Sequence, residues 1–144
     1  AVDSGHGQLD WRLRNDPRVI VHERTNARYL ASTHVPELVT IITCDASFIS
    51  LTKILPAPLE LARSGANLIA LVKPQFEAER SAVDYRGVVR DVCHRAKAVM
   101  VVVLAARDRG WRIGGVLRSP INGANGNHEY LIWLRTLQFK GSIS

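Results

Sequence analysis

Residues 38–45 read Leu-Val-Thr-Ile-Ile-Thr-Cys-Asp, an apolar and β-branched run that ends on an acid. Residues 67–73 read Asn-Leu-Ile-Ala-Leu-Val-Lys and end on a lysine, and a shorter run over residues 19–21 ends at a polar loop. Runs that are nearly continuous, rather than alternating, are typical of parallel strands covered on both faces. The sequence therefore predicts an α/β fold with a doubly wound, mostly parallel sheet.

Helical segments alternate with these runs, and we expect them over residues 7–14, 50–63 and 91–109. Ser50 or Thr52 is a plausible N-cap for the second helix, and Gly65 is expected to stop it. The third segment has strand-like composition in its middle, but it is long, Asp91 can cap it and a glycine follows. We therefore expect it to form a buried helix.

The last part of the chain predicts a hairpin. Residues 111–117 and 129–136 have strand composition, and residues 119–127 between them are rich in turn formers. Two strands joined by such a loop form an antiparallel pair, which we place at the sheet edge.

The composition describes a basic chain of one-domain size. The chain has 144 residues, a mass of 16.0 kDa, 47% apolar residues and a net charge of +6. The charge favours a polyanionic partner, although a basic surface also serves solubility. No apolar run reaches the roughly 18 residues of a membrane span, and the sequence does not open with a signal-peptide pattern.

The two cysteines, Cys44 and Cys93, are far apart and lie in apolar surroundings. Their spacing gives neither a disulfide framework nor a metal site. We expect both to be buried free thiols in a reducing compartment, which predicts a cytoplasmic protein that holds no metal.

Three charged residues flank the predicted strands where ligands bind in open α/β sheets. Asp45 and Lys73 end strands, and Glu129 begins the last one. An ammonium between two carboxylates is suited to proton handling, although two carboxylates alone would keep it charged. Simple alternatives remain: Asp45 could cap the next helix, and Lys73 could extend to solvent.

A second candidate site lies at the start of the chain. Asp3 ends a short apolar segment and could accept hydrogen bonds from ribose hydroxyls, while Gly5 and Gly7 would let a ligand approach the backbone. Asn26 follows the run at residues 19–21 and could contact an adenine edge. A plain turn at residues 3–5 and a solvated loop at residues 22–26 are the alternatives.

Seven segments of the chain, in order, resemble one protein family. Two are specific, the Asp-Ala-Ser-Phe-Ile-Ser block at 45–50 and the Lys-Pro-Gln-Phe-Glu block at 73–77; the others are 2–9, 13–19, 23–26, 87–91 and 119–129. On these segments the sequence resembles the TlyA family, often labelled haemolysin A. Its members are FtsJ-like, S-adenosylmethionine-dependent ribosomal RNA 2′-O-methyltransferases.

The resemblance implies a Rossmann-like class I methyltransferase sheet and a role for each candidate. The family uses a Lys-Asp-Lys-Glu tetrad, of which Asp45, Lys73 and Glu129 match three members. Lys73 would help remove the proton of a ribose hydroxyl, with the two acids placing it. Asp3, Gly5, Gly7, Asn26 and Asp45 would bind the cofactor, and Arg90 is the arginine we expect to contact RNA.

The same resemblance implies pieces that the sequence does not contain. The family's first strand with its Gly-rich cofactor turn, the first tetrad lysine and a small RNA-binding domain would all precede residue 1. Residues 81–86 also differ from the Gly/Lys-rich stretch usual there. We therefore expect residues 1–144 to be a partial methyltransferase domain without its central strand, inactive alone, with open sheet edges that could pair two copies.

Two other functions stay open at this point. The chain could be a non-catalytic fragment that binds RNA through its basic face without cofactor. The haemolysin label could also mean membrane lysis, although the sequence has no spanning segment and no long basic amphipathic helix.

Overall fold

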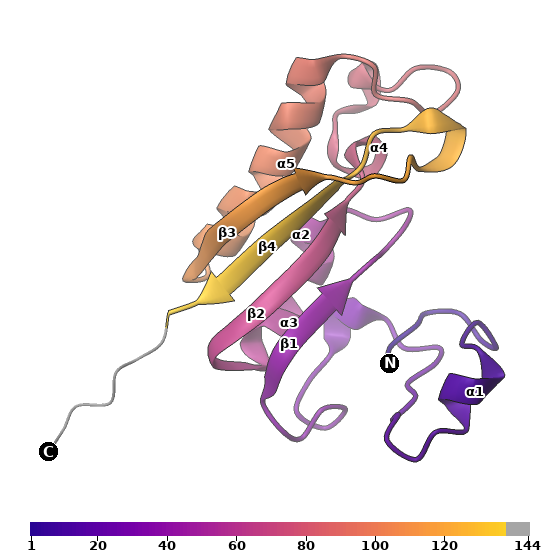
Figure 1. Cartoon of the computed structure of the whole chain (residues 1–144), viewed down its shortest axis with the longest axis vertical. Coiled ribbons are helices and arrows are strands. Elements are labelled where there is room, and N and C mark those ends of the chain that lie inside the picture. Colours follow the sequence, from indigo (N-terminus) through magenta and orange to yellow (C-terminus); the bar gives the residue numbers. More distant parts are fainter. Residues whose placement is uncertain (138–144) are drawn as a thin grey trace, which may run out of the picture.

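The computed structural model describes residues 1–137, which form a mixed sheet covered by helices on one face (Figure 1). In chain order the elements are α1 (Trp11–Arg14), η1 (Ala27–Tyr29), β1 (Val39–Cys44), α2 (Leu51–Ile54), α3 (Pro56–Glu60), β2 (Ala62–Val72), α4 (Pro74–Glu77), η2 (Arg80–Ala82), α5 (Val92–Arg107), β3 (Trp111–Arg118), η3 (Ala124–Gly126) and β4 (Tyr130–Thr136). The predicted α/β class is confirmed.

The sheet has four strands in the order β1-β2-β4-β3. β1 and β2 are parallel, whereas β4 is antiparallel to both β2 and β3. The C-terminal hairpin is therefore present, and the central strand β2 joins the parallel and antiparallel parts. Within residues 1–137, β1 has no strand partner on its outer edge.

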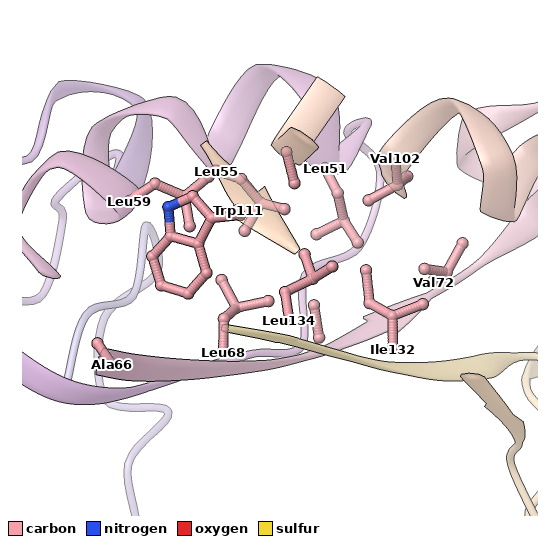
Figure 2. Close-up of a cluster of buried hydrophobic side chains, with 12 residues drawn as sticks. Leu51, Leu55, Leu59, Ala66, Leu68, Val72, Val102, Trp111, Ile132 and Leu134 are labelled. Carbon is pink, nitrogen blue, oxygen red and sulfur yellow. The ribbon is translucent and has the colours of Figure 1, made fainter. Parts of the chain in front are cut away.

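The core lies between the sheet and the helices (Figure 2). α5 places Ala98, Val102 and Ala106, which lie four residues apart, against the sheet. The fully or nearly buried side chains are Leu51, Leu55, Leu59, Ala66, Leu68, Ala70, Val72, Val102, Ala106, Trp111, Ile132 and Leu134. Burying each leucine-sized side chain stabilises the fold by about 1.5–3 kcal/mol, so this layer holds the sheet and helices together.

The other face of the sheet is not covered by the described residues, so the expectation of a sheet covered on both faces is wrong. Alternate residues of β2 show the difference, because Leu68 and Ala70 are fully buried whereas Ile69 between them is 44% exposed. Ile41 on β1 and Trp133 on β4 are exposed beside it. The continuous apolar pattern is real, but it marks an apolar surface here rather than a second buried layer.

Several predicted boundaries move. The first predicted helix shrinks to α1, and the second is two short helices, because Pro56 starts α3 and the chain is already extended at Ala62. Gly65 therefore does not stop a helix: it lies within β2 with a φ of 77°, where the register with β1 shifts. The helix predicted at 91–109 is α5, capped by Asp91, but it buries only one face.

Both cysteines are free thiols, as predicted, but neither is buried as expected. Cys93 lies on the first turn of α5 and is exposed, and Cys44 is only partly buried. Burial, with the Asp45 carboxylate next to it, raises the pKa of the Cys44 thiol to about 11. This cysteine therefore stays protonated and unreactive at neutral pH.

Residues 1–38 form a mostly polar segment beside β1, and its η1 lies against α2 and α3 (Figure 1). The run at residues 19–21 forms no ladder; a single parallel bridge joins Val2 to His22. The segment is held by polar contacts centred on Glu23, whose carboxylate accepts hydrogen bonds from the Gly7 N–H at 2.8 Å and from Arg14, and pairs with His6 at 2.6 Å.

Candidate active site at the end of the sheet

Lys73 is held by two oxygen atoms at the carboxyl end of the parallel strands. β1 ends at Cys44 and β2 at Val72, so the residues that follow them lie at one edge. The Lys73 Nζ lies 2.7 Å from the Asp45 carboxylate and donates a hydrogen bond to the Ser47 Oγ at 2.8 Å. The lysine side chain is only 14% exposed, so its ammonium is fixed rather than extended into solvent.

Glu129 lies at the same end of the sheet, directly before the antiparallel strand β4. Val72 pairs with Tyr130, so Glu129 and Lys73 each sit one residue beyond the last pair of this ladder. The Glu129 side chain is buried, and its Oε1 accepts a hydrogen bond from the Gln75 amide at 3.2 Å. The structure thus brings the three residues predicted from strand ends to one edge of the sheet.

The short helix α4 ties this edge together. Residues 75–77 follow the lysine, and each reaches a different part of the site: Gln75 reaches Glu129, the Phe76 ring lies 5.2 Å from the Phe48 ring, and Glu77 reaches the start of α2. The Glu77 carboxylate accepts hydrogen bonds from the Ser50 hydroxyl at 2.5 Å and the Leu51 N–H at 2.7 Å. Burial raises the pKa of Glu77, against the opposing effect of these two hydrogen bonds.

A pocket of about 390 Å³ opens at the loop that follows β1. Its lining combines two cations with aromatic, aliphatic and polar side chains, namely Arg28, Phe48, Ile49, Ser50, Lys53 and Phe76. Phe48 is 90% exposed and has a φ of 65°, a left-handed conformation that is costly for a large side chain. An exposed aromatic ring between cations is suited to stacking on a nucleobase.

The predicted cofactor residues near the N-terminus lie close together. The Asp3 Oδ1 accepts a hydrogen bond from the Gly5 N–H at 2.7 Å, and the Gly5 carbonyl accepts one from the Arg24 N–H at 3.0 Å. The Gly7 N–H is already bound to Glu23. The Asn26 side-chain oxygen caps η1 by accepting from the Arg28 N–H at 3.0 Å, which leaves its amide NH2 and one acceptor position of the oxygen for a ligand.

Arg90, the predicted RNA contact, is in an exposed ion pair. Its Nε donates to the Asp84 carboxylate at 2.8 Å, and its side chain is 67% exposed. Asp84 also accepts from the Val88 and Arg86 N–H groups, so it organises the loop that carries Arg90. The arginine is accessible, but part of its donor capacity is used within the protein.

Residue-by-residue reading of the sequence missed Ser47, Gln75 and Glu77 as parts of the site. All three stand inside the two specific sequence blocks, at 45–50 and 73–77. Their polar side chains in those blocks are the signal that could have found them.

Comparison with known proteins identifies the family of the chain. A family model described as FtsJ-like methyltransferase matches residues 1–136. The chain belongs to the FtsJ-like methyltransferase family. Membership confirms the family resemblance seen in the sequence, and with it an enzyme class.

Individual relatives carry two kinds of name. The Mycobacterium tuberculosis protein "16S/23S rRNA (cytidine-2'-O)-methyltransferase TlyA" is 48% identical over 136 residues, which are 94% of this chain and 51% of that protein. "Hemolysin A" of Brachyspira hyodysenteriae is 40% identical over 91% of this chain and 55% of its own length. The chain spans about half the length of the curated relatives it matches.

A solved structure shares the fold. A Streptococcus thermophilus protein described as a hemolysin superposes with a TM-score of 0.90 at 40% identity, covering 95% of this chain and 50% of that one. Among residues 1–137, no helix combines the length and apolar character that crossing a membrane requires. The same residues contain no group of three or more His, Cys, Asp or Glu side chains suited to a metal ion.

Proposed function

We propose that this chain carries the acceptor side of an S-adenosylmethionine-dependent ribosomal RNA 2′-O-methyltransferase. The observation that supports this most strongly is the Lys73 ammonium fixed between Asp45 and Ser47, beside buried Glu129 at the sheet edge. Membership of the FtsJ-like family and the rRNA methyltransferase names of relatives point the same way.

The chemistry proposed for Lys73 is proton transfer from a ribose hydroxyl. In its neutral form the Nζ accepts the hydroxyl proton while the oxygen forms its bond to the methyl carbon. Asp45 and Ser47 fix the direction of the nitrogen, and Glu129 supplies a second carboxylate at the same edge. Most of the acceleration comes from alignment of the two substrates, so these residues act mainly through position.

The N-terminal segment fits the ribose of the cofactor. One oxygen of the exposed Asp3 carboxylate is held by Gly5, and the other makes no hydrogen bond among residues 1–137, which leaves it open to paired ribose hydroxyls. S-adenosylmethionine would supply there an electrophilic methyl group on a sulfonium, whose carbon–sulfur bond breaks as the new carbon–oxygen bond forms. Asn26 and Asp45 would complete this side of the site.

The RNA side of the proposal rests on charge and on the pocket. The net charge of +6 favours a polyanion, and Arg28 and Lys53 line the same pocket as the exposed Phe48 ring. Arg90 would add a phosphate contact from the neighbouring loop. The partner would be ribosomal RNA or a ribosomal subunit, which places the protein in the cytoplasm.

One further expectation is part of this proposal: two copies of the chain pair through the open edge of β1. A non-catalytic RNA-binding fragment is the second candidate, favoured by the half-length match to the relatives, and it predicts no calorimetric binding of S-adenosylmethionine.

A graft tests the proposed reaction. Residues 1–136 would replace the matching segment of the Mycobacterium tuberculosis relative, and methyl transfer to ribosomal subunits would be measured. Lys73→Met should lower the rate by about 100-fold or more, whereas Lys97→Met, on the exposed side of α5, should leave it unchanged. Equal rates for the parent graft and Lys73→Met would refute the role of the lysine.

A further inference from the structure

Glu129 is held in a buried place by very little. Its side chain is 7% exposed, and the hydrogen bond from the Gln75 amide is the one side-chain contact of this kind described for it within residues 1–137. A buried carboxylate is costly unless its oxygens are hydrogen-bonded, so its surroundings decide where it can sit.

Gly123 limits it from the opposite side. A Cβ on this glycine would lie 2.0 Å from the Glu129 Oε1 and 2.4 Å from its Cδ, closer than any real contact. The Gly123 φ is −75° with an extended ψ, a conformation that any residue adopts. A side chain at position 123 would therefore force the Glu129 carboxylate to move, whereas the backbone conformation itself would accept any residue.

The loop that carries Gly123 is itself anchored. The Gly123 N–H donates to the Asn127 carbonyl at 2.8 Å. The Asn127 side chain is buried, accepts from the Val89 N–H at 3.1 Å and donates to the Gly87 carbonyl at 2.8 Å. The glycine cannot move away from Glu129 without breaking these bonds.

Gln75 has one defined orientation because of Glu129. Its Oε1 is buried with no hydrogen-bond partner in the described part of the chain, whereas its Nε2 donates to the carboxylate. Rotating the amide by half a turn would place two acceptor oxygens against each other. The charged acid thus holds the amide, and the amide holds the acid.

We propose that Gln75 and Gly123 are positioning residues that clamp the Glu129 carboxylate at the end of the sheet. Gln75 acts by its hydrogen bond, and Gly123 by leaving the space that the carboxylate fills. The catalytic half of this inference rests on the proposed function, in which Glu129 supplies the second carboxylate at the same end of the sheet as Lys73. A displacement of about 1 Å in such a group can cost about 100-fold in rate.

A stability cycle on the chain itself tests the contact without any activity. Gly123→Ala should lower the melting temperature by about 5 °C or more in the parent and far less in a Glu129→Ala background, where the clash is gone. Gly115→Ala is the matched control, since a Cβ there meets no heavy atom within 4 Å. An equal loss in both backgrounds would overturn the clamp. Gln75→Leu is measured in the parent and in the Glu129→Ala background. An equal fall in melting temperature in both would show that Gln75 does not hold the Glu129 carboxylate.

Kinetics of the graft test the positioning role. Gly123→Ala and Gln75→Leu should each lower kcat by about 10-fold or more while the KM for RNA stays within about twofold. Aspartate is one methylene shorter, so in a Glu129→Asp background Gly123→Ala should cost little further. The same fold loss in both backgrounds, or a loss confined to KM, would overturn positioning. A parent graft with no methyl transfer would count against the proposed function, and the stability cycle would still decide the clamp.

Discussion

The carboxyl end of the parallel strands and the N-terminal segment both carry predicted site residues, yet different interactions hold them in place. Lys73 and Glu129 stand at the ends of β2 and β4, which contain the fully buried Val72 and Ile132. Residues 1–38 contain no buried residue and are held by polar contacts around Glu23. The difference shows that the core positions the acceptor-side residues Lys73 and Glu129. The proposed cofactor residues near the N-terminus depend instead on the polar contacts around Glu23, which we expect to unfold locally while the core stays folded.

The largest expected effect is on the core side. Leu134→Ala removes a fully buried side chain of β4 and should lower the free energy of unfolding by about 2–5 kcal/mol. Urea unfolding would measure it. The control is Leu117→Ala on β3, which is 63% exposed on the uncovered face and should cost less than about 1 kcal/mol. Similar costs for the two would mean that the exposed face is covered in solution.

The next largest effect should be a local loss of protection in the N-terminal segment that leaves the sheet unchanged. Glu23→Gln weakens the pairs with Arg14 and His6, so amide hydrogen exchange of residues near Gly7 should quicken by about tenfold or more. Amides of β2 and β4 should keep their protection, because no core contact changes. Faster exchange throughout the sheet would show that the two regions unfold as one unit.

Lowering the pH should destabilise the N-terminal segment around Glu23 and stabilise the contacts of Glu77 at the end of the sheet. Burial opposes the charged form of Glu23, but the Gly7 N–H and the Arg14 guanidinium lower the pKa of Glu23 below its ordinary 4.5. Its stabilising effect is therefore present above pH 4.5 and lost as pH falls through the lowered value. Burial raises the pKa of Glu77 above 4.5, so its effect is greatest below pH 4.5 and is lost as pH rises through the raised value.

Hydrogen exchange between pH 6 and pH 3, corrected for intrinsic rates, would measure this difference. Protection near Gly7 should fall on acidification below about pH 4.5, while Glu77→Gln should remove only the pH dependence that arises at the start of α2. Parallel pH profiles for both regions would contradict the assignment of the two acids.

The smallest effect concerns the exposed ion pair. Arg90→Ala breaks the contact with Asp84 and should cost less than about 1 kcal/mol, because the arginine is largely solvated. If Arg90 contacts a phosphate, a plot of log affinity for ribosomal RNA against log salt concentration should be less steep for Arg90→Ala, by about 1. An unchanged slope would remove Arg90 from the RNA-binding surface.

The sequence was a good guide where strand ends decide the outcome. Asp45 and Lys73 follow continuous apolar runs, and the parallel pairing of those runs brings the two residues within 2.7 Å. α5 and the hairpin were also predictable, because Asp91 caps one and a turn-rich loop joins the other.

Other features could not be read from local pattern. A continuous apolar run looks the same whether its second face is buried or exposed, so the open face with Ile69 was not foreseen. Val19–Val21 has strand composition, but its neighbour is only the chain around Val2, and a single bridge results. The contact between Gly123 and Glu129 depends on loop geometry that residue types do not report.

The contacts made by Lys73 and by α4 also determine when the site can form during folding. Lys73 meets Ser47 across 26 residues of chain, and Gln75 meets Glu129 across 54. Contacts of such separation form late, after the loops between them have closed. During synthesis, a chain that has emerged only as far as α5 holds the lysine and its first acid but lacks Glu129. The complete site therefore reports that β4 has inserted next to β2, and its assembly is a measure of the last step of sheet formation.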